Sequence, residues 1–151
     1  MTGLEEMVSK LQRIERELSR KKGPFALFGL FLREDVSDRW DLLVAAPWME
    51  GREVEAVRLI ASKLTKELET EELLRISRII PLSIMDPEVE RITSAIHVEH
   101  GSIEITNCNF FGLWIPKAVL ITSCKQDASD NTRMKSVKTD IRTSKAKATT
   151  G

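Results

Sequence analysis

The sequence predicts an α/β (α+β) fold in which helices pack on a mixed sheet, in the element order α-β-β-α-β-α-β-(β). Segments with apolar residues at helical spacing alternate with short apolar runs that are typical of strands. The 151 residues suit one domain, and 42% hydrophobic with 30% charged residues is the balance of an ordinary folded protein. We therefore expect one domain over residues 1–124.

A helix is predicted at the N-terminus, because one apolar stripe recurs there at steps of three and four residues. Two lysines and then Gly23 and Pro24 follow the stripe, as is common where a helix ends. The stripe fits a helix packed on its own domain, and it also fits a short coiled coil that would make the chain a homodimer. The stripe residues are Leu4, Met7, Leu11, Ile14 and Leu18.

Two strands joined by a short turn are predicted next. An apolar segment begins at Pro24, a polar break extends to Arg39, and a second apolar segment covers Trp40 to Ala46. The run from Leu42 to Ala46 is continuous, which is typical of a strand buried on both faces. Pro47 ends this strand, because proline cannot donate to a sheet.

A long helix over Glu50–Glu72 and a strand over Ile76–Ile84 follow. Pro81 favours a bulge or an edge position for that strand. A short helix over Glu88–Ile96 has Asp86 as its N-cap and proline as its first residue.

The last predicted elements are strands. Residues 103–106 alternate as a strand with one solvent-facing side, and residues 118–121 read as a short final strand. The run from Phe110 to Ile115 is the strongest apolar segment in this part of the chain. It is either core or, if it is exposed, a surface for a partner.

Charge and hydropathy exclude several classes of protein. The 23 basic and 23 acidic residues balance, so nucleic acid is not the expected partner. Residues 125–151 nevertheless carry a net charge of +4, and their few large apolar residues predict a disordered basic tail. The chain has no apolar run long enough to span a membrane and no signal-peptide pattern at its start. We therefore expect a cytoplasmic protein without a membrane partner.

The cysteines and histidines do not indicate a metal site. Cys108 and Cys124 make no disulfide framework and are expected to be free thiols. His97 and His100 lie near Cys108 in sequence, but the pair of closely spaced cysteines typical of zinc sites is absent, so both read as surface histidines at a helix end. Cys108 also has no base adjacent in sequence, which makes it a weak candidate for a nucleophile.

A family resemblance rests on the segment Leu27–Ala46. It contains Phe28-Gly29 in the first strand and Asp41, followed by three apolar residues, in the second. These residues and the order of elements over residues 4–106 resemble the nucleotidyltransferase superfamily in its minimal form. The resemblance implies a nucleotidyltransferase-like mixed sheet, with a Phe-Gly-Ser turn, an Asp-x-Asp pair and a third carboxylate before a Pro-Leu pair. It also implies that such minimal domains often act beside a small helical partner protein.

The sequence departs from that family at the residues that carry out its chemistry. Leu30 replaces the serine, Arg39 stands two residues before Asp41, and Arg78 stands where the resemblance puts the third carboxylate. Transfer of a nucleotidyl group uses divalent cations held by carboxylates. A guanidinium about 5 Å from a dication costs roughly 6–7 kcal/mol at an effective dielectric near 20, before screening. We therefore expect a degenerate nucleotidyltransferase, a pseudoenzyme without a cofactor.

Our leading interpretation is a protein that acts through nucleotide or protein binding. Gly29, Arg39 and Arg78 are then the nucleotide-binding residues, because guanidinium groups match phosphate geometry. The same two arginines could instead form ion pairs with Asp41 in place of a metal.

Two alternatives remain open. An active Mg²⁺-dependent nucleotidyltransferase would use Asp41 and Asp38 as catalytic residues, with a bulge turning both to one face and Asp86 or Glu104 adding a third oxygen. A structural dimerisation module would instead use the stripe of the N-terminal helix.

Overall fold

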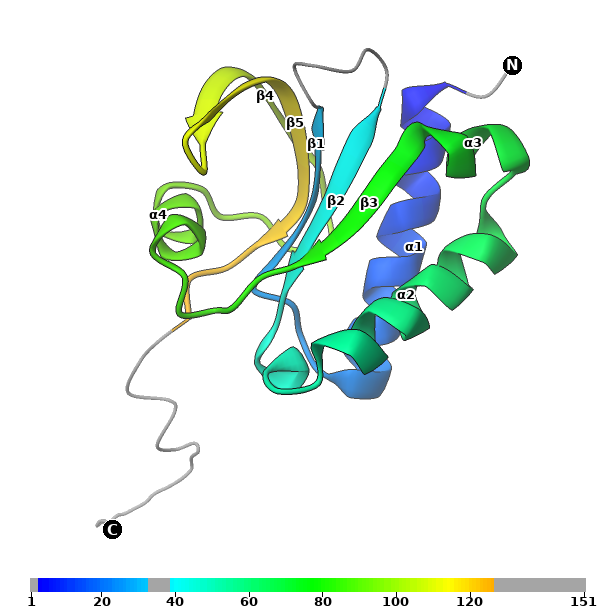
Figure 1. Ribbon diagram of the computed structural model, residues 1–151, viewed down its shortest axis with the longest axis horizontal. Helices are drawn as coiled ribbons and strands as arrows, with labels where there is room; N and C mark the ends of the chain where they lie inside the picture. Colours follow the sequence, from blue (N-terminus) through cyan, green and yellow to red (C-terminus); the bar gives the residue numbers. More distant parts are fainter. Residues whose placement is uncertain (1–2, 33–38, 127–151) are drawn as a thin grey trace, which may run out of the picture.

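The computed structural model describes residues 3–32 and 39–126. Asp38 and all but the first two residues of the expected basic tail lie outside the described residues. Figure 1 shows a twisted sheet with α1 and α2 on one face and α4 on the other. The predicted α+β class and the order of the elements are confirmed, with one predicted helix divided in two.

The sheet has the strand order β3-β2-β1-β5-β4. β1 lies at its centre and pairs antiparallel with both β2 and β5, and β5 pairs antiparallel with β4. β2 and β3 pair in parallel, and α2 and α3 connect them, as a parallel connection requires. The strands are β1 (Leu27–Leu32), β2 (Trp40–Ala45), β3 (Ile76–Pro81), β4 (Ile103–Phe110) and β5 (Leu113–Ser123).

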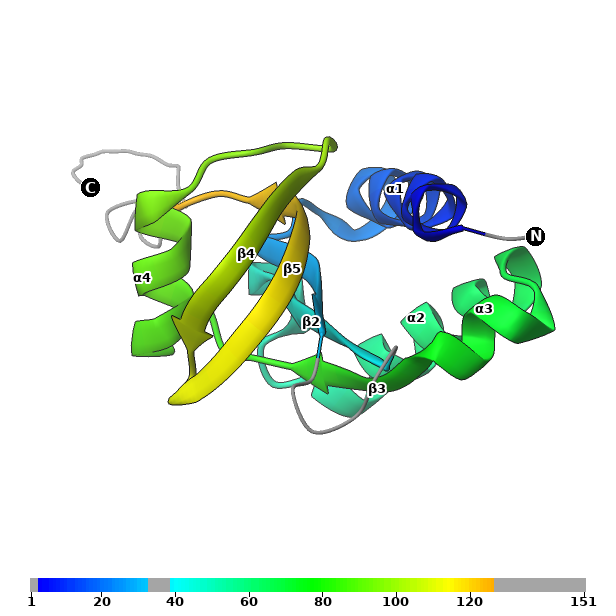
Figure 2. The same cartoon turned by 90° about the horizontal axis from the view of Figure 1, so that it is seen from above.

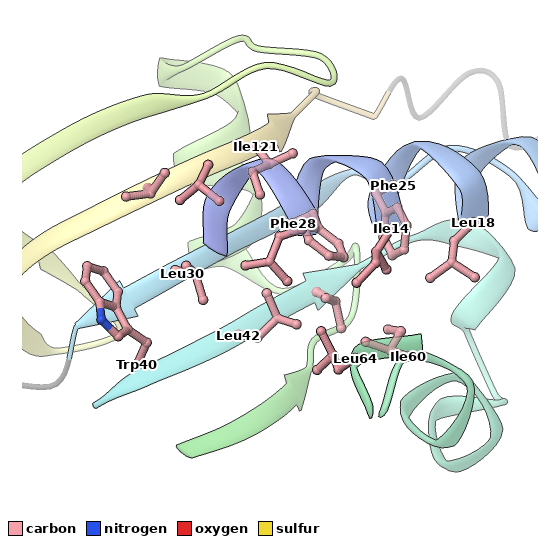
Figure 3. Packing of buried hydrophobic residues seen from close by; sticks show 14 of the residues in the cluster. Ile14, Leu18, Phe25, Phe28, Leu30, Trp40, Leu42, Ile60, Leu64 and Ile121 are labelled. Atoms are coloured by element: carbon pink, nitrogen blue, oxygen red, sulfur yellow. The ribbon is translucent and has the colours of Figure 1, made fainter. Parts of the chain in front are cut away.

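Helix α1 (Leu4–Lys22) packs its apolar stripe against the sheet of its own chain. Met7, Leu11, Ile14 and Leu18 of the stripe are at most 1% exposed. Figure 3 shows Ile14 and Leu18 directed toward Phe28 and the other core residues. The stripe is therefore occupied within the domain and is not available for the dimerisation that we considered from the sequence.

The helix expected over Glu50–Glu72 is wrong in its length. A short 3₁₀ turn η1 (Pro47–Met49) precedes α2 (Glu53–Glu67), and a separate helix α3 (Thr70–Arg75) follows. The break lies at Leu68, which is extended and only 6% exposed, so burying its side chain redirects the chain. Glu69 then begins α3 through a reciprocal capping box with Glu72.

Strand β3 is an edge strand, as Pro81 predicted, and it ends at that residue rather than at Ile84. The predicted helix start is also confirmed. α4 (Pro87–Ala95) begins with proline, and the Asp86 carboxylate accepts a hydrogen bond from the backbone N–H of Glu88 at 2.8 Å.

The C-terminal strands form a longer hairpin than the sequence predicted. β4 and β5 are joined by a two-residue turn in which Phe111 and Gly112 have φ of 55° and 73°, the signs of a type I′ turn. The apolar run is thus divided by a turn. Phe110 and Ile115 are buried, whereas Leu113 and Trp114 are 62% and 44% exposed. Figure 2 shows this hairpin running beside α4.

Two apolar cores lie on opposite faces of the sheet. One joins α1 and α2 to the face that carries Phe28, Leu30 and Leu42 (Figure 3). The other joins Val89 and Ile92 of α4 to the opposite face. No helix in the described part of the chain is long and apolar enough to cross a membrane.

Candidate functional site

The side chains of Asp41 and Arg78 form an ion pair on neighbouring strands. The Arg78 Nε donates to one carboxylate oxygen of Asp41 at 3.2 Å, and a terminal guanidinium nitrogen donates to the other at 2.7 Å. Asp41 is 6% exposed, whereas the Arg78 side chain is 55% exposed. The carboxylate that the family resemblance assigns to a metal is therefore bound in a two-pronged contact by a cation of its own chain.

The local fold explains why Arg78 meets Asp41. β2 and β3 are parallel, and their register shifts between Trp40 and Asp41, so that Trp40 pairs with Ile76 and Asp41 pairs with Arg78. The shift brings Asp41 opposite Arg78 rather than Ser77. Paired residues on adjacent strands point their side chains to the same face, which puts the guanidinium beside the carboxylate.

The turn that the family resemblance implies at Phe28-Gly29 is not formed, because both residues lie inside β1, which continues to Leu32. Gly29 pairs with β2 on one side and with β5 on the other. A Cβ at this position would lie 2.7 Å from Cδ2 of Leu120, so the absence of a side chain allows close packing against β5. The interior of a central strand gives a phosphate no access to Gly29, and we remove it from the candidate site.

The other predicted site residues lie near the start of β2. Arg39 is exposed and immediately precedes that strand, two residues from Asp41. Asp38 lies outside the described residues. The structure thus brings Arg78 to Asp41, which confirms the ion-pair interpretation for that arginine.

The acidic residues considered as further metal ligands serve other contacts. Asp86 caps α4, and Glu104 on β4 pairs with Lys117 on β5 at 2.6 Å. Within residues 3–32 and 39–126, no group of three His, Cys, Asp or Glu side chains is placed to hold a metal ion.

The two cysteines are poor nucleophiles in their present surroundings. Burial raises the pKa of the Cys108 thiol, and burial together with the nearby Glu99 carboxylate raises the pKa of Cys124 to about 11. A nucleophilic cysteine needs the opposite shift, because the thiolate is the reactive form. The thiols are free, as the sequence predicted.

A buried polar cluster on α1 was missed by the sequence analysis. The Glu15 side chain has no exposed surface and contacts Ser19, His100 and Thr122. His100 therefore lies in the loop after α4 and binds α1 while 40% of its side chain stays exposed, so the predicted position at a helix end is wrong for this residue. The sequence did contain a sign of this cluster. Glu15 lies four residues after Leu11 and three before Leu18, which places it beside the apolar stripe.

Comparison of the chain with protein-family models, with curated proteins and with solved structures finds no match. The candidate site is therefore defined by its geometry: a buried carboxylate neutralised by a half-exposed guanidinium, with a second exposed arginine near by in sequence. This arrangement can attract an anion through Arg78 and Arg39, since both keep exposed side chains.

Proposed function

We propose that the chain is a nucleotidyltransferase-like domain that binds a nucleotide through its phosphates and does not carry out metal-dependent transfer. The bound phosphates would contact Arg39 and Arg78. The single observation that carries the proposal is the two-pronged ion pair between Arg78 and Asp41.

The ion pair supports binding over transfer because it opposes a metal in two ways. The Asp41 oxygens that a cation would need already accept hydrogen bonds from Arg78. The guanidinium also stays protonated at all physiological pH values and repels a dication placed beside it. If a metal displaced the guanidinium, it would pair with a single carboxylate, and that carboxylate is only 6% exposed.

The charge and exposure of the arginines support an anionic ligand. Arg78 combines a fixed position, set by Asp41, with a side chain that is 55% exposed. A guanidinium held in one orientation loses less conformational entropy when it binds a phosphate. Nucleotide binding in this proposal needs no metal ion.

The experiment is a titration of the ¹⁵N-labelled full chain with each nucleoside triphosphate, first in EDTA and then in magnesium, followed by amide NMR. We expect saturable shifts at Asp41 and Arg78 in EDTA that magnesium does not strengthen. Shifts that require magnesium would instead favour the active transferase with Asp41 and Asp38. The absence of a saturable shift with every nucleotide would overturn the proposal.

Two variants distinguish specific recognition of the nucleotide from nonspecific attraction by positive charge. Arg39→Gln is expected to weaken nucleotide binding at least fivefold, because it removes a cation without disturbing the ion pair. Arg20→Gln removes another exposed arginine, from the last turn of α1, and is expected to leave binding unchanged. Equal losses in both variants would indicate nonspecific attraction to the protein surface.

A further inference from the structure

A second concave site lies between the end of α1 and the start of α2. This pocket has a volume of about 190 Å³ and is lined by Lys22, Trp48, Arg52, Glu55, Ala56 and Leu59. Asp41 is the second residue of β2, whereas Trp48 follows the other end of that strand. Six strand residues span about 20 Å, so the pocket is separate from the ion pair of Asp41.

The indole ring of Trp48 is held by its neighbours. Phe25 contacts it edge to face, with ring centroids 5.5 Å apart. A Cβ at Gly23 would lie 3.2 Å from Cδ1 of Trp48, the carbon bonded to the indole nitrogen. The N–H edge of the ring is therefore near the segment that contains Lys22, one wall of the pocket.

The Trp48 indole nitrogen is buried and has no hydrogen-bond partner among the described residues. An indole N–H only donates, so the group it lacks is an acceptor. Leaving such a donor buried and unpaired costs about 1–3 kcal/mol. Because that nitrogen has almost no accessible surface, the pocket presents the indole ring, and not its N–H, to a ligand.

The charges around the pocket favour an anion. Lys22 and Arg52 are both exposed and contribute two positive charges, and Glu55 contributes one negative charge. Arg52 is also the N-cap residue of α2, whose first turn receives no side-chain cap. Glu53 and Glu55 in the first turn offset the positive end of the helix dipole, so the preference for an anion rests on Lys22 and Arg52. Ala56 and Leu59 supply an apolar wall beside the indole ring.

We propose that this pocket binds a small organic oxyanion, a carboxylate or phosphate monoester attached to a flat apolar group. The oxyanion contacts Lys22 and Arg52, and the apolar group packs against Trp48 and Leu59. The volume lies below the roughly 300–1,000 Å³ of sites for drug-sized molecules, so the ligand is no larger than one ring with its acidic group.

The test uses the ¹⁵N-labelled full chain and two probes, benzoate and phenyl phosphate, with benzylamine as the cationic counterpart. Indole N–H signals report each tryptophan separately, and Trp48→Phe assigns the signal of Trp48. We expect either anionic probe to shift that signal saturably, while the signals of Trp40 and Trp114 stay in place. The tighter probe identifies the preferred oxyanion. A shift that is absent, unsaturable or equal with benzylamine overturns the proposal.

Charge variants test the site more sharply, because removing a cation and removing the anion should change the affinity for the probe in opposite directions. Lys22→Gln and Arg52→Gln should weaken the probe at least fivefold, whereas Glu55→Gln should strengthen it at least twofold. Arg20→Gln, on the last turn of α1 but outside the pocket lining, should leave the affinity unchanged. Equal weakening by Arg20→Gln, or no effect of Glu55→Gln, would contradict a site formed by these residues.

Discussion

The imidazole Nδ1 of His100 lies 2.7 Å from Oε1 of Glu15, a carboxylate without exposed surface on α1. The other oxygen of Glu15 accepts hydrogen bonds from Thr122 at 2.8 Å and from Ser19 at 3.1 Å. An ionised carboxylate only accepts, so this contact needs the proton on Nδ1 of His100. Three donors thus compensate a buried charge between α1 and the end of β5.

The same contact holds the loop between α4 and β4. His100 has a positive φ of 53°, an uncommon conformation for a residue other than glycine. Gln12 and Arg16, on either side of Glu15, donate to the carbonyl oxygens of Gly101 and His100 at 2.8 and 3.3 Å. Because several bonds from α1 converge on it, the loop keeps this backbone conformation.

Replacing Thr122 by valine is expected to destabilise the protein by about 1–2 kcal/mol, because it removes a hydroxyl that donates to the buried Glu15 carboxylate and accepts from the backbone N–H of His100. The change preserves side-chain shape, so the loss reports these two hydrogen bonds and not a cavity. The free energy of unfolding in urea measures it. Thr106→Val, at an exposed position on β4, should change that free energy by less than about 0.5 kcal/mol. Equal effects of the two changes would contradict a stabilising role for the cluster.

The sequence predicted the elements whose signals are local. The stripe of α1 and the Asp86-Pro87 start of α4 are examples, because helical spacing and capping depend on neighbours in the chain. The break at Leu68 was missed because α2 and α3 carry one continuous apolar pattern. Burial of Leu68 decides where the helical segment is interrupted. The length of the β4–β5 hairpin was missed for a similar reason, since Phe111-Gly112 interrupts a run that reads as continuous.

The candidate site was predictable in part. Asp41 and Arg78 were singled out from the sequence, and their pairing was one of the interpretations that it left open. The pairing itself depends on a register shift between β2 and β3, which no local pattern encodes. The close packing of Gly29 against Leu120 depends on β5, more than ninety residues further along the chain.

A carboxylate at the N-terminus of α4 makes the hairpin sensitive to acid. Glu88 accepts hydrogen bonds from Arg91 and from the backbone N–H of Phe111, each at 2.8 Å. The Arg91 guanidinium, with the Phe111 N–H, lowers the pKa of Glu88 from 4.5 to about 2. A lowered pKa means that this stabilisation is complete above about pH 5 and is lost as the pH falls toward 2.

Glu88→Gln should therefore destabilise the protein by about 1 kcal/mol at pH 7. The difference from the parent protein should shrink as the pH falls from 5 to 2. Urea unfolding over this pH range measures both effects. Glu90→Gln, an exposed position on the same helix, is the control and should show neither. A difference between parent and Glu88→Gln that stays constant with pH would show that Glu88 is not the titrating group.

Placing a carboxylate opposite Asp41 should create a cation site where the ion pair now lies. In Arg78→Asp the two acidic side chains would occupy paired positions on β2 and β3. We expect this variant to unfold more easily in EDTA, because two carboxylates repel each other. With a dissociation constant near 1 mM, magnesium at 10 mM would return about 1.4 kcal/mol. Thermal unfolding with and without magnesium measures this gain, and Arg78→Asn, which adds no carboxylate, should not show it.

Gly29→Ala distinguishes a packing role from a phosphate-binding role for this glycine. The added Cβ would lie 2.7 Å from Cδ2 of Leu120 and 3.0 Å from the backbone oxygen of Val119, so we expect about 1–3 kcal/mol of destabilisation from overpacking. Urea unfolding measures it. Combining the change with Leu120→Ala should cost less than the sum of the two single changes, because the shortened side chain makes room for the Cβ. Strict additivity, together with lost nucleotide binding in the folded Gly29→Ala protein, would return Gly29 to the phosphate site that the family resemblance implies.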